Sequence, residues 1–214
     1  VVEPVKPPPE KAPRYVESGT PIIPKSGEPI IITSKLYAGI DFYPSRKELP
    51  PIEDVIEAAK SSVDVLAFTV EHWADAAGLI AKSLGDDAHI KHFRFILLSP
   101  ASRFMKEVVE LNNRTTIPGR ISESLGKLRK IKDGLNDIQK GRLDIRIHDS
   151  LPIHSMIAVD AESDSGLIYV ENYMHGTSPR QWVTLRISRR EQGALFEKYW
   201  HSYRYVWERS KTWP

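Results

Sequence analysis

The stretch Leu151–Asp160, LPIHSMIAVD, joins a histidine to a closing aspartate through residues that alternate as they do in a β-strand. An imidazole such as that of His154 can act as a nucleophile or as a general acid or base, and a carboxylate such as that of Asp160 can orient it. Three interpretations are open: a catalytic strand, a strand that has lost its chemistry, and a core strand that carries a histidine. On the last, His154 is a hydrogen-bonded core residue, and Asp160 simply starts the turn DAESDSG.

A second group of polar residues follows in the stretch GLIYVENYMHG. Alternation places Glu171 and His175 on one face of the expected strand and Asn172 on the other. If this strand lies beside the first, the four residues His154, Glu171, Asn172 and His175 form a shared pocket. Arg180 is the nearest basic residue that could reach it. The alternative is that Glu171 and Asn172 are ordinary polar residues of a half-exposed strand.

Other positions offer weaker signals. The segment TVEHW places Glu71 and His72 at the C-terminal end of an expected strand, where open parallel sheets bind ligands, although helix capping explains them equally well. The seven histidines show no H-x-x-x-H or H-E-x-x-H spacing, so no zinc site is predicted. A phosphate-binding glycine loop and the G-x-G-x-x-G fingerprint are also lacking, so we expect no metal and no cofactor.

The composition narrows the class of protein. With 214 residues, 41% of them hydrophobic, the chain can form one α/β domain with an arm. A formal net charge of +2 points to neither a nucleic acid nor a membrane surface. The lack of cysteine predicts a reducing cytoplasm, and no apolar run approaches the roughly 18–20 residues of a membrane span. The chain does not open like a secretion signal. Val1 is not a natural first residue, which suggests a fragment with further domains beside it.

The proline-rich residues 1–33 predict an extended arm or linker, and residues 34–214 a single domain. Strand and helix patterns alternate up to Pro100, which predicts a parallel sheet with crossover helices. The expected order is strand 35–44, helix 51–62, strand 63–70, helix 74–87 and strand 91–100.

A helical block follows, broken at TTIPG. Its second helix, residues 120–141, carries a stripe of apolar residues spaced three and four apart, which predicts a seam against the sheet or a second subunit. The stripe consists of Leu125, Leu128, Ile131, Leu135 and Ile138. Basic residues between Lys127 and Lys132 favour a solvated face, with a phosphate-binding patch as the alternative. Four strands are expected between residues 143 and 188, then an aromatic helix that packs in the core.

This order of elements, together with LPIHSMIAVD, resembles the phospholipase D superfamily, and in particular a single-copy half domain of it. That family carries H-x-K, four residues and then D on a late strand, followed by a strand with a polar cluster that commonly contains asparagine. The resemblance implies an α/β fold with a mixed β-sheet flanked by helices, and a homodimer in which two motifs meet. It also implies metal-independent chemistry, in which one histidine attacks phosphorus and its partner protonates the leaving oxygen.

The sequence departs from that motif at two positions. Met156 stands in place of the lysine, and Ala161 in place of the aspartate, with Asp160 one residue early. Loss of one preorganised donor can lower a rate on the order of 10²–10³-fold. A looser resemblance links the last third of the chain to the degenerate phospholipase D-like domains attached to bacterial helix-turn-helix regulators, which implies a sensory role.

We therefore expect a non-catalytic or weakly catalytic module that binds a phosphate-bearing small molecule or nucleic acid, or that signals through dimer geometry. Its expected ligand-binding residues are His154, Asp160, Glu171, Asn172, His175 and Arg180. One alternative is a metal-independent phosphodiesterase or nuclease that acts through His154 across a homodimer. Another is a purely structural interaction domain.

Overall fold

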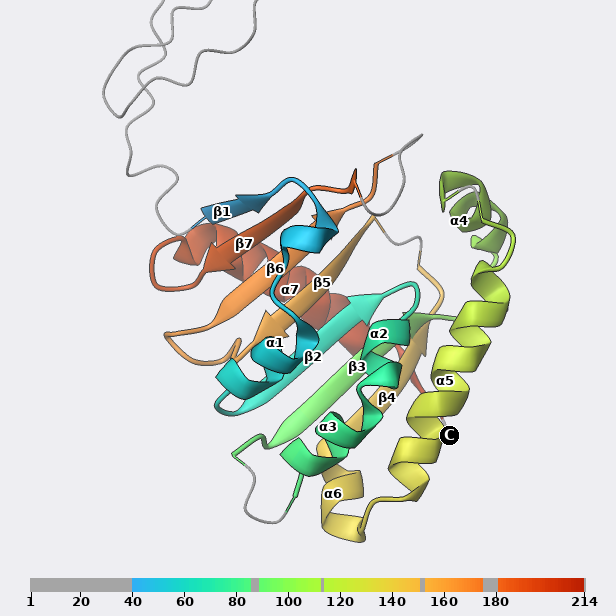
Figure 1. Cartoon of the computed structure of the whole chain (residues 1–214). Coiled ribbons are helices and arrows are strands. Elements are labelled where there is room, and N and C mark those ends of the chain that lie inside the picture. The colour runs from blue at the N-terminus through green and yellow to red at the C-terminus, as the bar shows by residue number, and fades with distance from the viewer. Residues whose placement is uncertain (1–39, 86–88, 113, 151–152, 175–180, 214) are drawn as a thin grey trace, which may run out of the picture. The chain divides into compact units, whose positions relative to one another are not determined.

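The computed structural model describes residues 40–85, 89–112, 114–150, 153–174 and 181–213. The chain divides into two units, Val1–Ala38 and Gly39–Pro214. The expected arm, residues 1–33, lies outside the described residues. The second unit is an α/β domain with helices on both faces of a mixed β-sheet, as the sequence predicts (Figure 1).

The sheet holds eight strands in the described part of the chain, in the order β1-β7-β6-β5-β2-β3-β4-β8. Strands β2, β3 and β4 are parallel to one another, and every other neighbouring pair is antiparallel. The strands are β1 (Ile40–Tyr43), β2 (Ser62–Ala67), β3 (His92–Leu98), β4 (Leu143–His148), β5 (His154–Val159), β6 (Leu167–Asn172), β7 (Thr184–Ser188) and β8 (Lys211–Thr212).

Most of the helices lie in front of the sheet in Figure 1, and the long helix α7 lies behind it. The helices are the short 3₁₀ helix η2 (Arg46–Glu48), α1 (Ile52–Ala58), α2 (Glu71–Asp75), α3 (Ala77–Ser83), α4 (Met105–Asn112), α5 (Ile117–Asp133), α6 (Asp137–Arg142) and α7 (Gly193–Arg209). Among the described residues, none of these helices is both long enough and apolar enough to span a membrane.

Each face of the sheet has its own apolar core, because successive residues of a strand point to opposite sides. On β2, Val63 and Val65 belong to the core under α1–α5, whereas Leu66 belongs to the core under α7. The predicted aromatic helix is confirmed as core packing: Phe196 and Trp200 of α7 are buried in that second core.

One predicted strand pairing is wrong. The first strand was expected to open a parallel βαβ series, but β1 pairs antiparallel with β7 at the edge of the sheet. Its central residues, Asp41 and Phe42, are exposed, as an edge position permits. Arg186 of β7 forms an ion pair with Asp41 that helps to hold the edge. The parallel part of the sheet is therefore β2–β3–β4.

The long helix expected over residues 120–141 is two helices. Asn136 accepts a hydrogen bond from the Gln139 amide, and the Gln139 side chain accepts one from the Asn136 amide, so a capping box starts α6 afresh. Leu125 and Leu128 of α5 are buried as predicted, whereas Ile138, now in α6, is 64% exposed. The seam packs α5 against α2 and α3.

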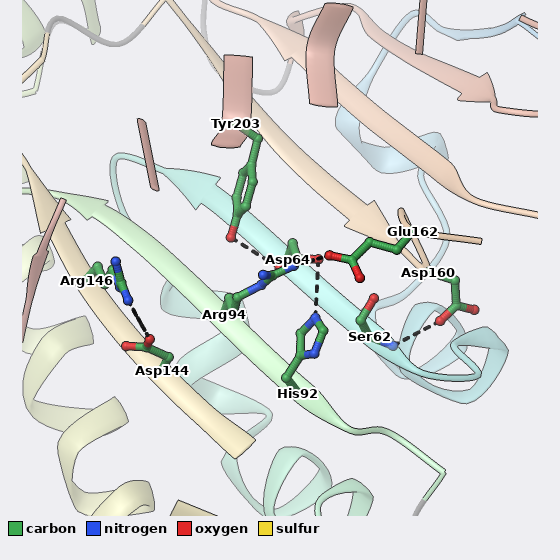
Figure 2. A network of polar contacts seen from close by, with 9 residues as sticks. All are labelled: Ser62, Asp64, His92, Arg94, Asp144, Arg146, Asp160, Glu162 and Tyr203. Atoms are coloured by element: carbon green, nitrogen blue, oxygen red, sulfur yellow. Dashed lines mark hydrogen bonds and ion pairs between the residues drawn. The ribbon is translucent and has the colours of Figure 1, made fainter. Parts of the chain in front are cut away.

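A buried charged network ties α7 to the middle of the sheet (Figure 2). Asp64 of β2 is fully buried and forms an ion pair with Arg94 of β3. The Tyr203 hydroxyl of α7 donates a hydrogen bond to Asp64 Oδ1 at 3.3 Å, and His92 Nε2 lies 3.9 Å from Oδ2. Burial raises the pKa of Tyr203, so this hydroxyl stays protonated and remains a donor. The Arg94 guanidinium lies 5.3 Å from the ring centre of Trp207.

Candidate functional site

The strand that carries the motif, β5, runs antiparallel to β6, with His154 opposite Asn172 and Ser155 opposite Glu171. Directly opposed residues point to the same face of a sheet, and successive residues point to opposite faces. His154 and Asn172 therefore share one face, and Glu171 shares the other with Ser155. The sheet separates Glu171 from the two residues that were expected to join it in one pocket.

His154 lies on the face covered by α7. It is 7% exposed, and its ring meets that of Tyr199 edge-on, with 5.7 Å between the ring centres. Its Nε2 atom has no hydrogen-bond partner among the described residues. Burial lowers the pKa of His154, so the ring is neutral near pH 7. The surroundings are those of a core histidine.

Met156 occupies the position of the motif lysine, and it is 1% exposed in the core under α7. The same core contains Ile168 and Val170 of β6 and Trp200 of α7. A lysine ammonium at this position would be buried among apolar groups without a partner, which is strongly unfavourable. The methionine at this position therefore fits the apolar packing of the core, which a lysine would not.

Asp160 anchors the turn at the far end of β5. Its carboxylate accepts hydrogen bonds from the backbone amides of Lys60, Ser61 and Ser62 at 2.8, 2.6 and 2.9 Å, and from the Ser61 hydroxyl at 2.8 Å. Burial alone would raise the pKa of Asp160, but these hydrogen bonds hold it below its ordinary value. Its φ of 49° is left-handed, a region that aspartate tolerates better than most residues. The role is structural.

His175 and Arg180, the other two expected ligand-binding residues, lie outside the described residues. Their place in a site stays a prediction.

A hollow lies on the face of the sheet opposite His154. It is a cavity of about 550 Å³ between the segment η2–α1 on one side and strands β5, β6 and β7 on the other. Its size is that of small-molecule sites, which usually measure about 300–1,000 Å³. Its lining consists of Arg46, Leu49, Pro50, Pro51, Ile52, Glu53, Val55, His72, Asp75, Ala76, Ser155, Ile157, Tyr169, Glu171 and Thr184.

A row of polar side chains crosses the floor of this cavity. Ser155, Glu171 and Thr184 are directly opposed on β5, β6 and β7, so they point to the same side. The Ser155 hydroxyl donates to Glu171 Oε2 at 3.0 Å. Thr184 is 1% exposed, and its hydroxyl has no hydrogen-bond partner among the described residues. Three polar groups thus face the cavity from three neighbouring strands.

Arg46 of η2 reaches across to Glu171. Its Nε donates to Glu171 Oε1 at 2.7 Å, and its Nη2 donates to Glu171 Oε2, which makes a bidentate ion pair. Burial alone would lower the pKa of Arg46, but the hydrogen bond with Glu171 raises it, so the guanidinium stays charged. The pair joins two segments 125 residues apart.

Carboxylates stand at the rim of the cavity. Glu53 and Asp75 are exposed there, and Lys127 of α5 donates to Asp75 at 2.7 Å from outside the lining. That hydrogen bond lowers the pKa of Asp75, so its carboxylate is charged at neutral pH. His72 also lines the cavity.

A smaller cavity of about 100 Å³ adjoins the first, and both are lined by Arg46, His72, Ser155 and Glu171. Glu71 lies in its wall and forms an ion pair with Arg120 of α5. Glu71 and His72, the two candidate residues of the segment TVEHW, thus line cavities at the carboxyl end of β2.

The sequence-based prediction missed three residues of the site: Arg46, Ser155 and Thr184. Ser155 and Thr184 could have been found by placing Glu171 in register with its neighbouring strands. No local signal marks Arg46, because its partner lies far along the chain. In the described part of the chain, no three histidine, aspartate or glutamate side chains are grouped to hold a metal ion.

No family model and no curated protein matches the sequence. Solved structures do match over 81% of this chain. Nuc from Salmonella typhimurium, described as a phospholipase D family member, matches with a TM-score of 0.47 and 14% identity over 97% of its chain. NucT from Helicobacter pylori matches with a TM-score of 0.48 and 12% identity over 98%.

TrmBL2, described as an archaeal chromatin protein with a novel mode of DNA binding, matches with a TM-score of 0.47 and 13% identity. This chain spans 54% of the length of TrmBL2. Among these matches, Nuc is described as a member of the phospholipase D family, the family that the motif resembles, and the similarity extends to nothing finer.

Proposed function

We propose that this domain is a non-catalytic module that binds a small molecule in the cavity between η2–α1 and strands β5–β7. The observation that carries the proposal is the cavity itself: about 550 Å³, with a buried carboxylate, two hydroxyls and apolar walls. A hollow of that size with a few convergent polar groups is typical of ligand-binding sites.

Catalysis through the motif has no support in the geometry. His154 is a buried neutral ring, and Asp160 is engaged in a turn at the other end of the strand. Neither residue lines the cavity. The homodimer and the cytoplasmic location stay predictions from the sequence.

A phosphate-bearing ligand, which the sequence favours, does not fit the charge of this cavity. Three carboxylates line it, those of Glu53, Asp75 and Glu171, against the single guanidinium of Arg46. The proposal therefore keeps the small-molecule ligand and leaves out the phosphate.

The test is a fragment screen by ligand-observed NMR, followed by amide shift mapping on labelled protein. Fragments that bind should shift the amides of Ser155, Tyr169 and Thr184. Ile157→Trp fills the cavity from β5 and should abolish those shifts, whereas Ile138→Trp, at an exposed site in α6, should leave them intact. The proposal fails if no fragment binds saturably, or if Ile157→Trp, shown to be folded, binds as the wild type does.

A further inference from the structure

We propose that the ligand of this cavity is an organic cation, an amine, amidinium or guanidinium on an apolar body, and that its charged group replaces Arg46 beside Glu171. This inference rests on the proposed function and adds the chemical class of the ligand.

The two partners of the Arg46–Glu171 pair differ in their freedom to move. The Glu171 side chain is 6% exposed and belongs to β6, which is held between β5 and β7. The Arg46 side chain is 41% exposed and belongs to a three-residue turn with no buried residue. Arg46 can move into water when another cation takes its place, but a buried Glu171 without any cation is strongly unfavourable. The positively charged partner of Glu171 can therefore be exchanged, but Glu171 cannot be left without one.

The charges around the cavity favour the same class of ligand. Glu53, Asp75 and Glu171 line it together with one guanidinium, so the lining carries two net negative charges. Lys127 offsets Asp75 from outside the lining. An anion that paired with Arg46 in place of Glu171 would leave the Glu171 carboxylate buried beside a second negative charge. A cation meets attraction both at the rim and on the floor.

The hydrogen-bonding groups suit a ligand with several N–H donors. Glu171 offers two carboxylate oxygens, and the Thr184 hydroxyl beside it, 1% exposed, has no partner among the described residues. Planar groups such as amidinium or guanidinium can donate to both carboxylate oxygens at once, as Arg46 now does. A further N–H can reach Thr184.

The rest of the lining specifies the body of the ligand. Apolar side chains of the η2–α1 segment form one wall, and Ile157 and the Tyr169 ring form the opposite one. The residues of the first wall are Leu49, Pro50, Pro51, Ile52 and Val55. A flat or branched apolar group attached to the cation would be desolvated between these walls.

Benzamidine and benzamide are a matched pair of probes for this proposal, because they share a shape and differ in charge. Isothermal titration calorimetry should show that benzamidine binds at least about tenfold more tightly than benzamide. Benzoate and phenyl phosphate should show no saturable binding. Amide shifts should place bound benzamidine at Ser155 and Thr184.

Two variants separate the roles of the pair. Glu171→Gln should weaken benzamidine by about tenfold or more and leave benzamide unchanged, because only the charged probe uses the carboxylate. Arg46→Ala should tighten benzamidine about tenfold, because it removes the internal competitor. Glu197→Gln alters a glutamate that is paired with Arg189 on the α7 side, so it serves as the matched control and should change nothing.

The outcomes distinguish this inference from the proposed function. If neutral or anionic probes bind in the cavity as tightly as benzamidine does, the proposal of a cationic ligand is overturned, whereas the proposal of a ligand-binding cavity is supported. Failure of benzamidine to bind Arg46→Ala, or an unchanged affinity in that variant once circular dichroism has shown it to be folded, also rules out a cationic ligand. If no fragment of any charge binds, the proposed function falls with it.

Discussion

His154 and Asp160 lie at opposite ends of strand β5, and an extended chain covers about 20 Å from residue 154 to residue 160. A carboxylate at that distance can neither orient the imidazole nor raise its basicity. The two residues that mark the motif in the sequence thus serve separate parts of the structure: the core under α7 and the turn before β2.

The first prediction concerns phosphodiester hydrolysis. In EDTA, the wild type and His154→Ala should both fail to hydrolyse bis-nitrophenyl phosphate or single-stranded DNA, since His154 is buried and its Nε2 has no hydrogen-bond partner among the described residues. Release of nitrophenol and gel analysis of the DNA measure this, with folding checked by circular dichroism. Turnover by the wild type that His154→Ala abolishes would contradict the non-catalytic proposal.

The second prediction concerns Asp160 as an anchor. Asp160→Ala should lower the free energy of unfolding by about 3 kcal/mol, because three amides and a hydroxyl lose a charged acceptor. Asp160→Asn should lose less, because asparagine keeps an acceptor and tolerates the left-handed backbone. Urea unfolding measures both. Glu162→Ala, whose side chain is 69% exposed, is the control; an equal loss there would count against a specific anchor.

Much of the fold can be predicted from residue spacing. The period of two in the stretches around Ile145, Ile157 and Ile168 predicted consecutive strands that the structure confirms as β4, β5 and β6. The apolar runs of β2 and β3 predicted strands buried on both faces. The pairing of β1 could not be predicted, because four residues carry no information about a partner more than 140 positions away.

The cavity could not be predicted for a similar reason. Its floor depends on the register of three strands, which sets Ser155 and Thr184 beside Glu171. Its other wall depends on how η2 and α1 pack over those strands. The motif drew attention to His154, although the cavity lies on the other face of the same strand. Spacing identifies faces, but only the register tells which side chains meet.

The third prediction concerns the Asp64–Arg94 pair under α7. Arg94→Met should lower the free energy of unfolding by about 3–5 kcal/mol, because it leaves a fully buried carboxylate without its cation. The double variant Asp64→Leu, Arg94→Met should recover most of that loss, since no charge is then left unpaired. Denaturant titration of both single variants and the double variant gives the coupling. A double variant as unstable as the sum of its singles would contradict this account.

The fourth prediction concerns pH. Burial lowers the pKa of His148, at the end of β4, to about 4 from an ordinary value of 6.5. Between these values the unfolded chain binds a proton that the folded chain does not. The contribution of His148 to the free energy of unfolding is therefore fully present above pH 6.5. It is lost as the pH falls from 6.5 to 4, and the loss is on the order of 3 kcal/mol. The lowered pKa of His154 adds a loss of the same sign.

Urea unfolding at a series of pH values checks this. His148→Gln should flatten the curve between pH 6.5 and 4. His201→Gln, at an exposed position of α7, is the control and should leave the wild-type curve unchanged. Equal slopes in His148→Gln and the wild type would rule out His148 as the source.

The fifth prediction contrasts two glycines. Gly126 lies exposed within α5, where an added Cβ meets nothing within 4 Å, so Gly126→Ala should stabilise the protein by about 0.5–1 kcal/mol. A Cβ at Gly166 would lie 2.9 Å from the Asp160 carbonyl oxygen and 3.0 Å from the Phe196 ring. Gly166→Ala should destabilise by about 1–3 kcal/mol, because backbone there must shift. Thermal unfolding of both variants decides; the same sign for both would contradict the packing described.

The pairing of β1 with β7 has a consequence for the order of folding. The two strands come together only after some 140 residues between them have been made, as the contact of Asp41 with Arg186 shows. Contacts of such long range are slow to form, because loop closure precedes any gain from pairing. On the ribosome, β2, β3 and β4 can assemble while β1 still waits for its partner. The cavity, whose floor needs β5, β6 and β7, is thus a late product of synthesis, and a truncated chain that stops before Thr184 has no place to hold a ligand.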